Sequence, residues 1–194
     1  EGNTIKLLQS ERLVLNYLQR LSGIATRTYS YAREIDHTEC IVLDTRKTTP
    51  GLRVLEKWAV ALGGGGNHRM GLYDMVMLKD NHIDFAGGIS EAVARTKAYL
   101  TESDRTLSIE VETRNMQEVA AAIRAGVDRI MLDNFSVSET KEAVKYIAGR
   151  TEVESSGGIT HDTLVPYAEC GVDFISVGAL THHIKGLDMS LKAL

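Results

Sequence analysis

Cysteine is scarce in this chain: only Cys40 and Cys170 occur among 194 residues, and no CxxC pair is present. This rules out a disulfide framework and a cysteine zinc site, and it is typical of a reduced, cytoplasmic protein. No apolar run approaches the roughly 20 residues of a transmembrane helix, so we expect no membrane partner. The chain also has no excess of basic residues, because it contains 22 Lys and Arg residues and 26 Asp and Glu residues. A net charge of −4 argues against nucleic-acid binding.

What is present is an ordinary globular composition, 43% hydrophobic and 25% charged. The N-terminal 35 residues carry apolar side chains at three- and four-residue steps, which predicts a long helix. We expect Ser10 to cap this helix and Gly23 to interrupt it, with helix resuming over residues 29–35. The predicted organisation is an N-terminal helical segment, residues 1–35, followed by one catalytic domain, residues 36–194.

Beyond residue 36, short apolar runs alternate with helical patterns. The runs that read as strands are residues 40–47, 74–80, 106–113, 128–134, 151–156 and 173–179. The helical patterns between them carry start and stop signals, including Thr49 before Pro50 and the glycines 126, 149 and 171. Strand–helix alternation predicts parallel strands covered by helices. We therefore predict a parallel α/β barrel of about six strands, complete or open, with a doubly wound sheet as the alternative.

Polar or small residues stand at the end of nearly every predicted strand. In chain order they are Arg46 and Lys47; Lys79; Glu110 and Glu112; Asp133; Ser156, Gly157 and Gly158; and Gly178. The carboxyl ends of barrel strands form one rim, where active sites lie. Glu110 and Glu112 share a strand face because side chains alternate with period two. The sequence thus predicts converging charged groups at one rim, which also favours the barrel over the doubly wound sheet.

The signs of these charges divide along the chain. The cationic residues lie nearer the N-terminus: Arg46, Lys47, His68, Arg69 and Lys79. Such a cationic set suits a dicarboxylate ligand. Glu112 and Asp133, with Glu110 in support, suit Mg²⁺ or a positive charge that develops on a sugar. Glycine turns at 156–158 and at 178 expose N–H groups of the kind that bind phosphate.

Seven segments, in chain order, resemble the motifs of the quinolinate phosphoribosyltransferases, also called nicotinate-nucleotide pyrophosphorylases. They are ERLVLNYLQRLSGIAT, DTRKTTPGLRVLEKWAV, GGGGNHRMGLYDMVMLKDNH, IEVET, IMLDNF, SSGGIT and ISVGALTH, and they run from about Glu11 to the end. The resemblance implies transfer of a phosphoribosyl group from phosphoribosyl pyrophosphate to quinolinate with Mg²⁺ present. Loss of CO₂ then gives nicotinate mononucleotide and pyrophosphate, a step of de novo NAD biosynthesis.

The resemblance also implies a role for each rim residue. Thr45, Arg46 and Lys47 would bind substrate, His68 and Arg69 would hold the quinolinate carboxylates, and Lys79 would lie between quinolinate and pyrophosphate. Glu112 and Asp133 would face the ribose and the metal, while the 5-phosphate would contact Ser156, Gly157, Gly158 and Gly178. Arg12 would reach the site of a neighbouring subunit, so a homodimer or larger homo-oligomer with composite active sites is expected.

Members of this family carry an additional N-terminal α/β domain, and we expect this chain to lack nearly all of it. One alternative is therefore a fragment that binds ligand without turning it over. A second is a paralogous, molybdenum-associated phosphoribosyltransferase that acts on another anionic base. A third is an aldolase barrel in which Lys79 forms a Schiff base.

Overall fold

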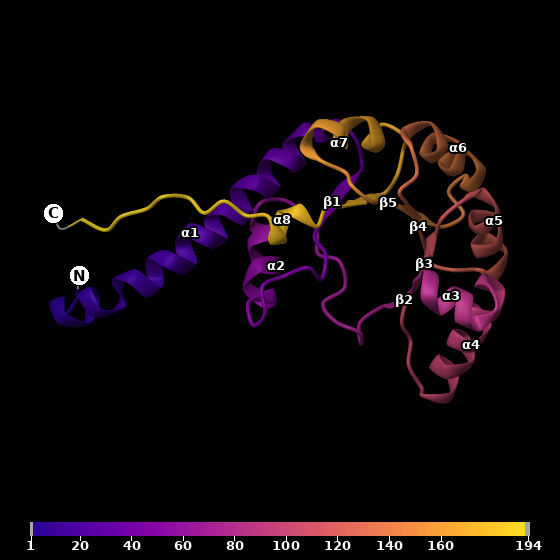
Figure 1. Cartoon of the computed structure of the whole chain (residues 1–194), viewed down its shortest axis with the longest axis horizontal. Helices are drawn as coiled ribbons and strands as arrows, with labels where there is room; N and C mark the ends of the chain where they lie inside the picture. Colours follow the sequence, from indigo (N-terminus) through magenta and orange to yellow (C-terminus); the bar gives the residue numbers. More distant parts are fainter. Residues whose placement is uncertain (1, 193–194) are drawn as a thin grey trace.

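The computed structural model describes residues 2–192 and confirms the α/β class. Its strands are β1 (Ile41–Leu43), β2 (Val76–Leu78), β3 (Ile109–Thr113), β4 (Arg129–Asp133), β5 (Glu152–Ser156) and β6 (Phe174–Ser176). All lie within the predicted segments but are shorter. They form one parallel sheet in the order β1-β6-β5-β4-β3-β2. Because the first strand pairs with the last, the sheet curves into a barrel that is open between β1 and β2 (Figure 1).

The glycine run follows the free edge of β1 at this opening. Gly66 forms a parallel bridge with Leu43, and its N–H donates to the Val42 carbonyl at 2.8 Å. A Cβ at Gly65 would lie 2.7 Å from the Thr28 side chain, and a Cβ at Gly66 would lie 2.7 Å from that of Leu43. Glycine thus permits a close backbone approach here, and residues 67–69 emerge beside the end of β1.

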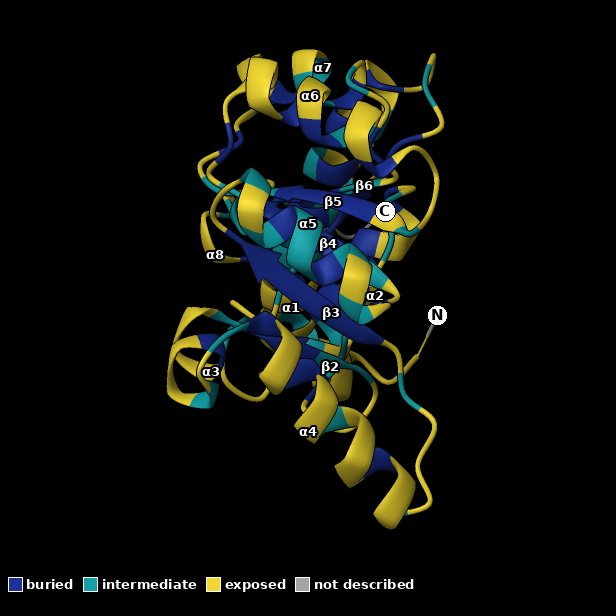
Figure 2. Cartoon of the chain, turned by 90° about the vertical axis from the view of Figure 1, so that its right-hand side faces the viewer, coloured by how far each residue is buried: buried dark blue, intermediate teal, exposed yellow. Residues whose placement is uncertain are grey.

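The helices are α1 (Thr4–Glu34), α2 (Arg53–Leu62), α3 (Asp80–Ala86), α4 (Ile89–Glu102), α5 (Met116–Ala125), α6 (Val137–Ile147), α7 (His161–Ala168) and α8 (Ala179–His182). Helices α3 to α7 follow the outside of the curved sheet (Figure 1). Their outer faces are exposed, whereas the sheet is largely buried (Figure 2). All five residues of β3 are buried, as expected for a covered parallel strand.

Two expectations about α1 are wrong. Its cap is Asn3, whose side chain accepts the Lys6 N–H at 3.2 Å, whereas Ser10 lies inside the helix and donates to the Lys6 carbonyl. Gly23 does not interrupt the 31-residue helix. A Cβ at Gly23 would lie 2.6 Å from the carbonyl oxygen of Lys185, so glycine here allows the C-terminal segment to pack on α1.

Of the three predicted glycine stop signals, one caps its helix: α5 ends at Gly126 in the left-handed conformation. Helix α6 is instead capped by Ala148 and α7 by Glu169, so Gly149 and Gly171 lie just beyond the caps. The helix expected from Thr49 begins only at Arg53, after a turn. Helix α1 packs against α2, α7 and α8, while its N-terminal half projects away from the barrel, with the C-terminal segment on the same side (Figure 1). The division at residue 35 stays a prediction.

Within residues 2–192, no helix is both long and apolar enough to cross a membrane.

Candidate active site

A cavity of about 710 Å³ lies at the predicted rim. Its lining includes every predicted site residue except Arg12 and the supporting Glu110: Thr45, Arg46, Lys47, His68, Arg69, Lys79, Glu112, Asp133, Ser156, Gly157, Gly158 and Gly178. Most of them lie at or just after the carboxyl ends of the strands, and His68 and Arg69 follow the glycine run beside β1, which is why segments far apart in the chain meet. The lining also contains residues to which the sequence analysis gave no role: Met77, Met131, Asn134, Ile159, Thr160, Ser176, Ala179 and His182.

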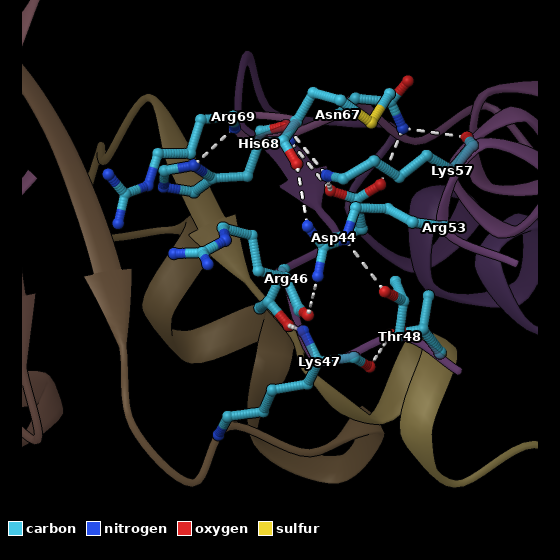
Figure 3. Close-up of polar contacts among 12 residues, drawn as sticks. Asp44, Arg46, Lys47, Thr48, Arg53, Lys57, Asn67, His68 and Arg69 are labelled. Carbon is cyan, nitrogen blue, oxygen red and sulfur yellow. Dashed lines mark hydrogen bonds and ion pairs between the residues drawn. The ribbon is translucent and has the colours of Figure 1, made fainter. Parts of the chain in front are cut away.

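Two guanidinium groups mark one end of the cavity. The side chains of Arg46 and Arg69 extend toward the same region (Figure 3). Arg69 Nη1 donates to the Met75 carbonyl at 3.2 Å, and the Arg46 side chain has no hydrogen bond within the described residues. Burial and then the charge of Arg46 lower the pKa of Arg69. Two neighbouring cations with so few protein partners favour an anionic ligand between them.

A buried ion pair fixes the segment that carries these groups. The Lys57 ammonium donates to the Asp44 carboxylate and, at 2.8 Å, to the His68 carbonyl. Asp44 also accepts from Asn67 Nδ2 at 2.7 Å and from the His68 N–H at 2.9 Å (Figure 3). Both charged side chains are at most 1% exposed. This network was not predicted from the sequence, although Asp44 directly precedes residues 45–47, which were predicted to bind substrate.

A second buried cluster surrounds the His68 ring. Nε2 lies 3.1 Å from Glu110 Oε2 and 3.4 Å from Glu154 Oε2, and Arg129 Nη1 lies 3.3 Å from the same Glu154 oxygen. Glu110, expected in support of Glu112, does not line the cavity but lies buried against His68. The role of Glu154 was missed, although it shares a strand face with Ser156.

The protonation of this cluster follows from its contacts. Burial alone would lower the pKa of His68, but the adjoining carboxylates of Glu110 and Glu154 outweigh it and raise the pKa at which the cluster loses its additional proton to about 9. Nδ1 accepts the N–H of Arg69 at 2.7 Å, so it carries a lone pair and the ring proton is on Nε2. Burial also raises the pKa of Glu110. We therefore assign the additional proton to the carboxylate side of a cluster that titrates as one unit.

Two carboxylates line the cavity on neighbouring strands. Glu112, on β3, forms an ion pair with Lys79. Asp133, at the end of β4, accepts from the Asn134 amide at 2.7 Å. Both are hard oxygen donors on one cavity wall, and Mg²⁺ needs only one or two such ligands because it keeps part of its water shell. The donor set therefore fits Mg²⁺.

The third part of the lining is made of small residues. Gly157 and Gly158 have φ values of 99° and 62°, and their N–H groups have no acceptor within the described residues. A Cβ at Gly157 would lie 2.3 Å from Asn134 Oδ1, and a Cβ at Gly178 would lie 3.0 Å from His182 Nε2. Free N–H groups at a glycine turn are suited to phosphate.

Arg12, like Glu110, is a predicted residue outside the cavity lining. It is exposed on the projecting half of α1 and does not line the cavity. Its predicted role in a neighbouring subunit is consistent with this position and stays a prediction.

Comparison with known proteins agrees with the geometry. Residues 24–192 match a family described as quinolinate phosphoribosyl transferase, C-terminal domain. The chloroplastic nicotinate-nucleotide pyrophosphorylase [carboxylating] of Oryza sativa subsp. japonica is 50% identical over 98% of this chain and 55% of its own length. The probable nicotinate-nucleotide pyrophosphorylase [carboxylating] of Bacillus subtilis is 46% identical, over 98% of this chain and 65% of its own.

Solved structures extend the similarity to three dimensions. NadC from Streptococcus pyogenes has a TM-score of 0.94 at 44% identity, covering 99% of this chain and 66% of that one. The nicotinate-nucleotide pyrophosphorylase from Francisella tularensis has a TM-score of 0.93 at 46% identity, covering 97% and 66%. The chain spans 55% and 65% of the length of the two curated relatives named above.

Proposed function

Because this chain belongs to the quinolinate phosphoribosyltransferase family, we propose that it forms the catalytic barrel of a decarboxylating enzyme of NAD biosynthesis. The enzyme transfers a phosphoribosyl group from phosphoribosyl pyrophosphate to the ring nitrogen of quinolinate. Pyrophosphate, CO₂ and nicotinate mononucleotide are the products. The observation that carries the proposal is one cavity with two guanidinium groups, two carboxylates and a glycine turn with free N–H groups.

The cationic part of the cavity suits quinolinate, a planar dicarboxylate. Arg46 and Arg69 would hold its two carboxylates, with His68 beside them and Thr45 and Lys47 completing the pocket. Each charged hydrogen bond contributes about 1.5–3 kcal/mol. Binding both substrates would hold the ring nitrogen close to C1 of the ribose, so that the reaction no longer depends on a bimolecular encounter. This loss of translational and rotational freedom before the chemical step is the first source of rate acceleration.

The remaining lining suits the other substrate. Ser156, Gly157, Gly158 and Gly178 would bind the 5-phosphate through backbone N–H groups. As the bond from C1 to pyrophosphate breaks, positive charge grows on the ribose, and the carboxylates of Glu112 and Asp133 would stabilise it. Lys79 would lie near the departing pyrophosphate.

Glu112 and Asp133 would also hold Mg²⁺, directly or through water. When bound, the ion supplies neutralisation of the pyrophosphate charge.

A homodimer with composite sites forms part of the proposal. The projecting half of α1 exposes a set of apolar side chains: Ile5, Leu8, Leu13, Val14 and Leu18 are 47–67% exposed. Exposed apolar surface beyond single scattered side chains marks interaction sites. A partner that packs around this half of α1 would cover these side chains, and its own Arg12 would be placed to reach the cavity.

The substrate assignment is tested by calorimetry with quinolinate and phosphoribosyl pyrophosphate separately, so that neither measurement depends on turnover. Replacing Arg69 by Met should weaken quinolinate binding about 10- to 100-fold, the value of one charged hydrogen bond. Phosphoribosyl pyrophosphate affinity should change only a few-fold. The matched control is Arg105→Met, because Arg105 is exposed and outside the cavity. Equal loss of both ligands in Arg69→Met would contradict the assignment.

The alternatives give different outcomes. CO₂ release that depends on quinolinate separates this enzyme from the molybdenum-associated paralogue. An aldolase would be trapped by borohydride as an adduct on Lys79, but Lys79 is engaged in an ion pair with Glu112, whereas a Schiff base needs a free amine. Assaying the 194-residue chain beside a version extended by the N-terminal part of a relative tests the binding-only alternative. The cytoplasmic location stays a prediction.

A further inference from the structure

Two carboxylates beneath the cavity have no role in the proposed reaction. Glu110 and Glu154 are both 0% exposed, and both face Nε2 of His68. Arg129 contacts Glu154 from β4, but Glu110 forms no hydrogen bond within the described residues, and its one ion-pair contact there is with this ring. Burying a carboxylate costs free energy that an apolar residue of similar size would avoid. The cost indicates a function beyond packing.

The His68 ring links these two carboxylates to the backbone of Arg69, which lines the cavity. Nε2–H faces the two carboxylates, while Nδ1 accepts the backbone N–H of Arg69 at 2.7 Å. The Arg69 guanidinium in turn donates to the Met75 carbonyl at 3.2 Å. If Nδ1 carried the proton instead, it would face the Arg69 N–H, and two donors would meet. The direction in which Arg69 leaves the backbone therefore depends on which ring nitrogen is protonated.

We propose that Glu110 and Glu154 are positioning residues for substrate binding. They hold the Nε2–H tautomer of His68, whose Nδ1 fixes the backbone of Arg69 and so aims its guanidinium at the anionic ligand. Neither carboxylate lines the cavity, so both act through His68. The identity of that ligand as quinolinate rests on the proposed function, whereas the tautomer does not.

A metal ion is the competing explanation for this cluster. The ligand atoms of His68, Glu110 and Glu154 lie within 4.8 Å of one another, a spacing that a divalent ion could accept. A metal on Nε2 would require the proton to move to Nδ1, where the Arg69 N–H leaves no room for it. The hydrogen bond to Nδ1 therefore favours a protonated Nε2 over a metal-bound one.

The first test uses the unmodified chain. Two-bond ¹H–¹⁵N spectra of protein labelled with ¹⁵N-histidine distinguish a protonated from an unprotonated ring nitrogen, and the signals of His68 are assigned by their loss in His68→Gln. We expect Nε2 protonated and Nδ1 unprotonated, with no change on adding Zn²⁺. A His68 ring protonated on Nδ1, or one whose signals shift with stoichiometric Zn²⁺, would overturn the proposal.

The second test separates positioning from general destabilisation. Glu154→Leu should weaken quinolinate binding about tenfold, comparable to losing one charged hydrogen bond, while inorganic pyrophosphate affinity is unchanged. Glu154→Gln, which keeps an acceptor, should lie between, and both variants should show a population with Nδ1 protonated. The control is Glu152→Gln, because Glu152 contacts the same Arg129 but not His68.

Each outcome decides a separate point. Wild-type quinolinate affinity in Glu154→Leu would refute the positioning role. If Glu154→Leu does not fold, Glu154→Gln and the unmodified chain still test the tautomer. If the unmodified chain binds no quinolinate but shows the expected tautomer, the proposed substrate is wrong and the role of the two carboxylates in holding the ring stands.

Discussion

Replacing Lys57 by Met tests whether the buried ion pair of Asp44 and Lys57 holds the cavity together. The Asp44 side chain is 0% exposed and would lose its only cationic partner within the described residues, while keeping the donors of Asn67 and His68. Removing one partner of a buried pair costs about 3–5 kcal/mol. Domains are stable by about 5–15 kcal/mol, so the loss is roughly a fifth of the total or more.

The assay is urea unfolding followed by circular dichroism. With a slope of about 1–3 kcal/mol per molar urea, the midpoint should fall by at least about 1 M. Adding Asp44→Asn to Lys57→Met should recover part of the loss, since the buried charge is removed along with its partner. The control is Arg95→Met, whose pair with Glu91 has both side chains more than half exposed, and which should cost at most about 0.5 kcal/mol.

Two results would refute this reasoning. One is a Lys57→Met protein within 1 kcal/mol of the unmodified chain, which would mean that the Asp44 charge is solvated. The other is a double variant that is no more stable than Lys57→Met, which would mean that the charge of Asp44 is not the source of the cost.

Three further predictions concern backbone packing and pH. Gly23→Ala should lower the melting temperature because its Cβ would lie 2.6 Å from a carbonyl of the C-terminal segment, whereas Gly186→Ala, with its nearest contact at 3.6 Å, should not. Gly157→Ala should weaken inorganic phosphate binding, measured by calorimetry, because a φ of 99° strains an alanine and Asn134 occupies the space. The buried cluster of His68, Glu110 and Glu154 keeps its additional proton up to a pKa of about 9, against 6.5 for a free histidine. The stabilisation that this proton gives is therefore fully present below pH 6.5 and lost as the pH rises through 9. Urea unfolding between pH 6 and 9.5 should show this loss, at most about 3 kcal/mol, and His68→Gln should remove it.

Local patterns in the chain were sufficient to predict the order of strands and helices. A strand that is covered by helices has the sequence pattern of a short apolar run. The carboxyl end of such a strand is marked in the sequence by a polar residue, such as Lys79 or Asp133. Because all carboxyl ends of a parallel barrel lie on one rim, these local signals also predicted the cavity lining. Two predicted residues lie outside the lining. Glu110 is buried against His68, and Arg12 lies on a helix, where only its motif distinguished it.

Glycine was the residue type whose structural role was predicted least well from the local sequence. The same residue type ends α5 at Gly126, continues α1 at Gly23 and approaches β1 at Gly66. At Gly126 the left-handed conformation is a local property of the helix end. At Gly23 and Gly66 the absence of a Cβ matters because another segment lies against the backbone. The partner at Gly23 is 162 residues away in the chain, and no local pattern indicates it.

The sequence by itself determined the α/β alternation and the residues that gather at the rim, because both depend on side-chain periodicity and chain direction. Only the tertiary structure decided that β1 pairs with β6, that Asp44 is neutralised by Lys57, and that Glu110 and Glu154 meet at His68. The two glutamates are on strands separated by β4. Whether they meet depends on the curvature and stagger of the whole sheet, which are set by closing the barrel and not by any one segment.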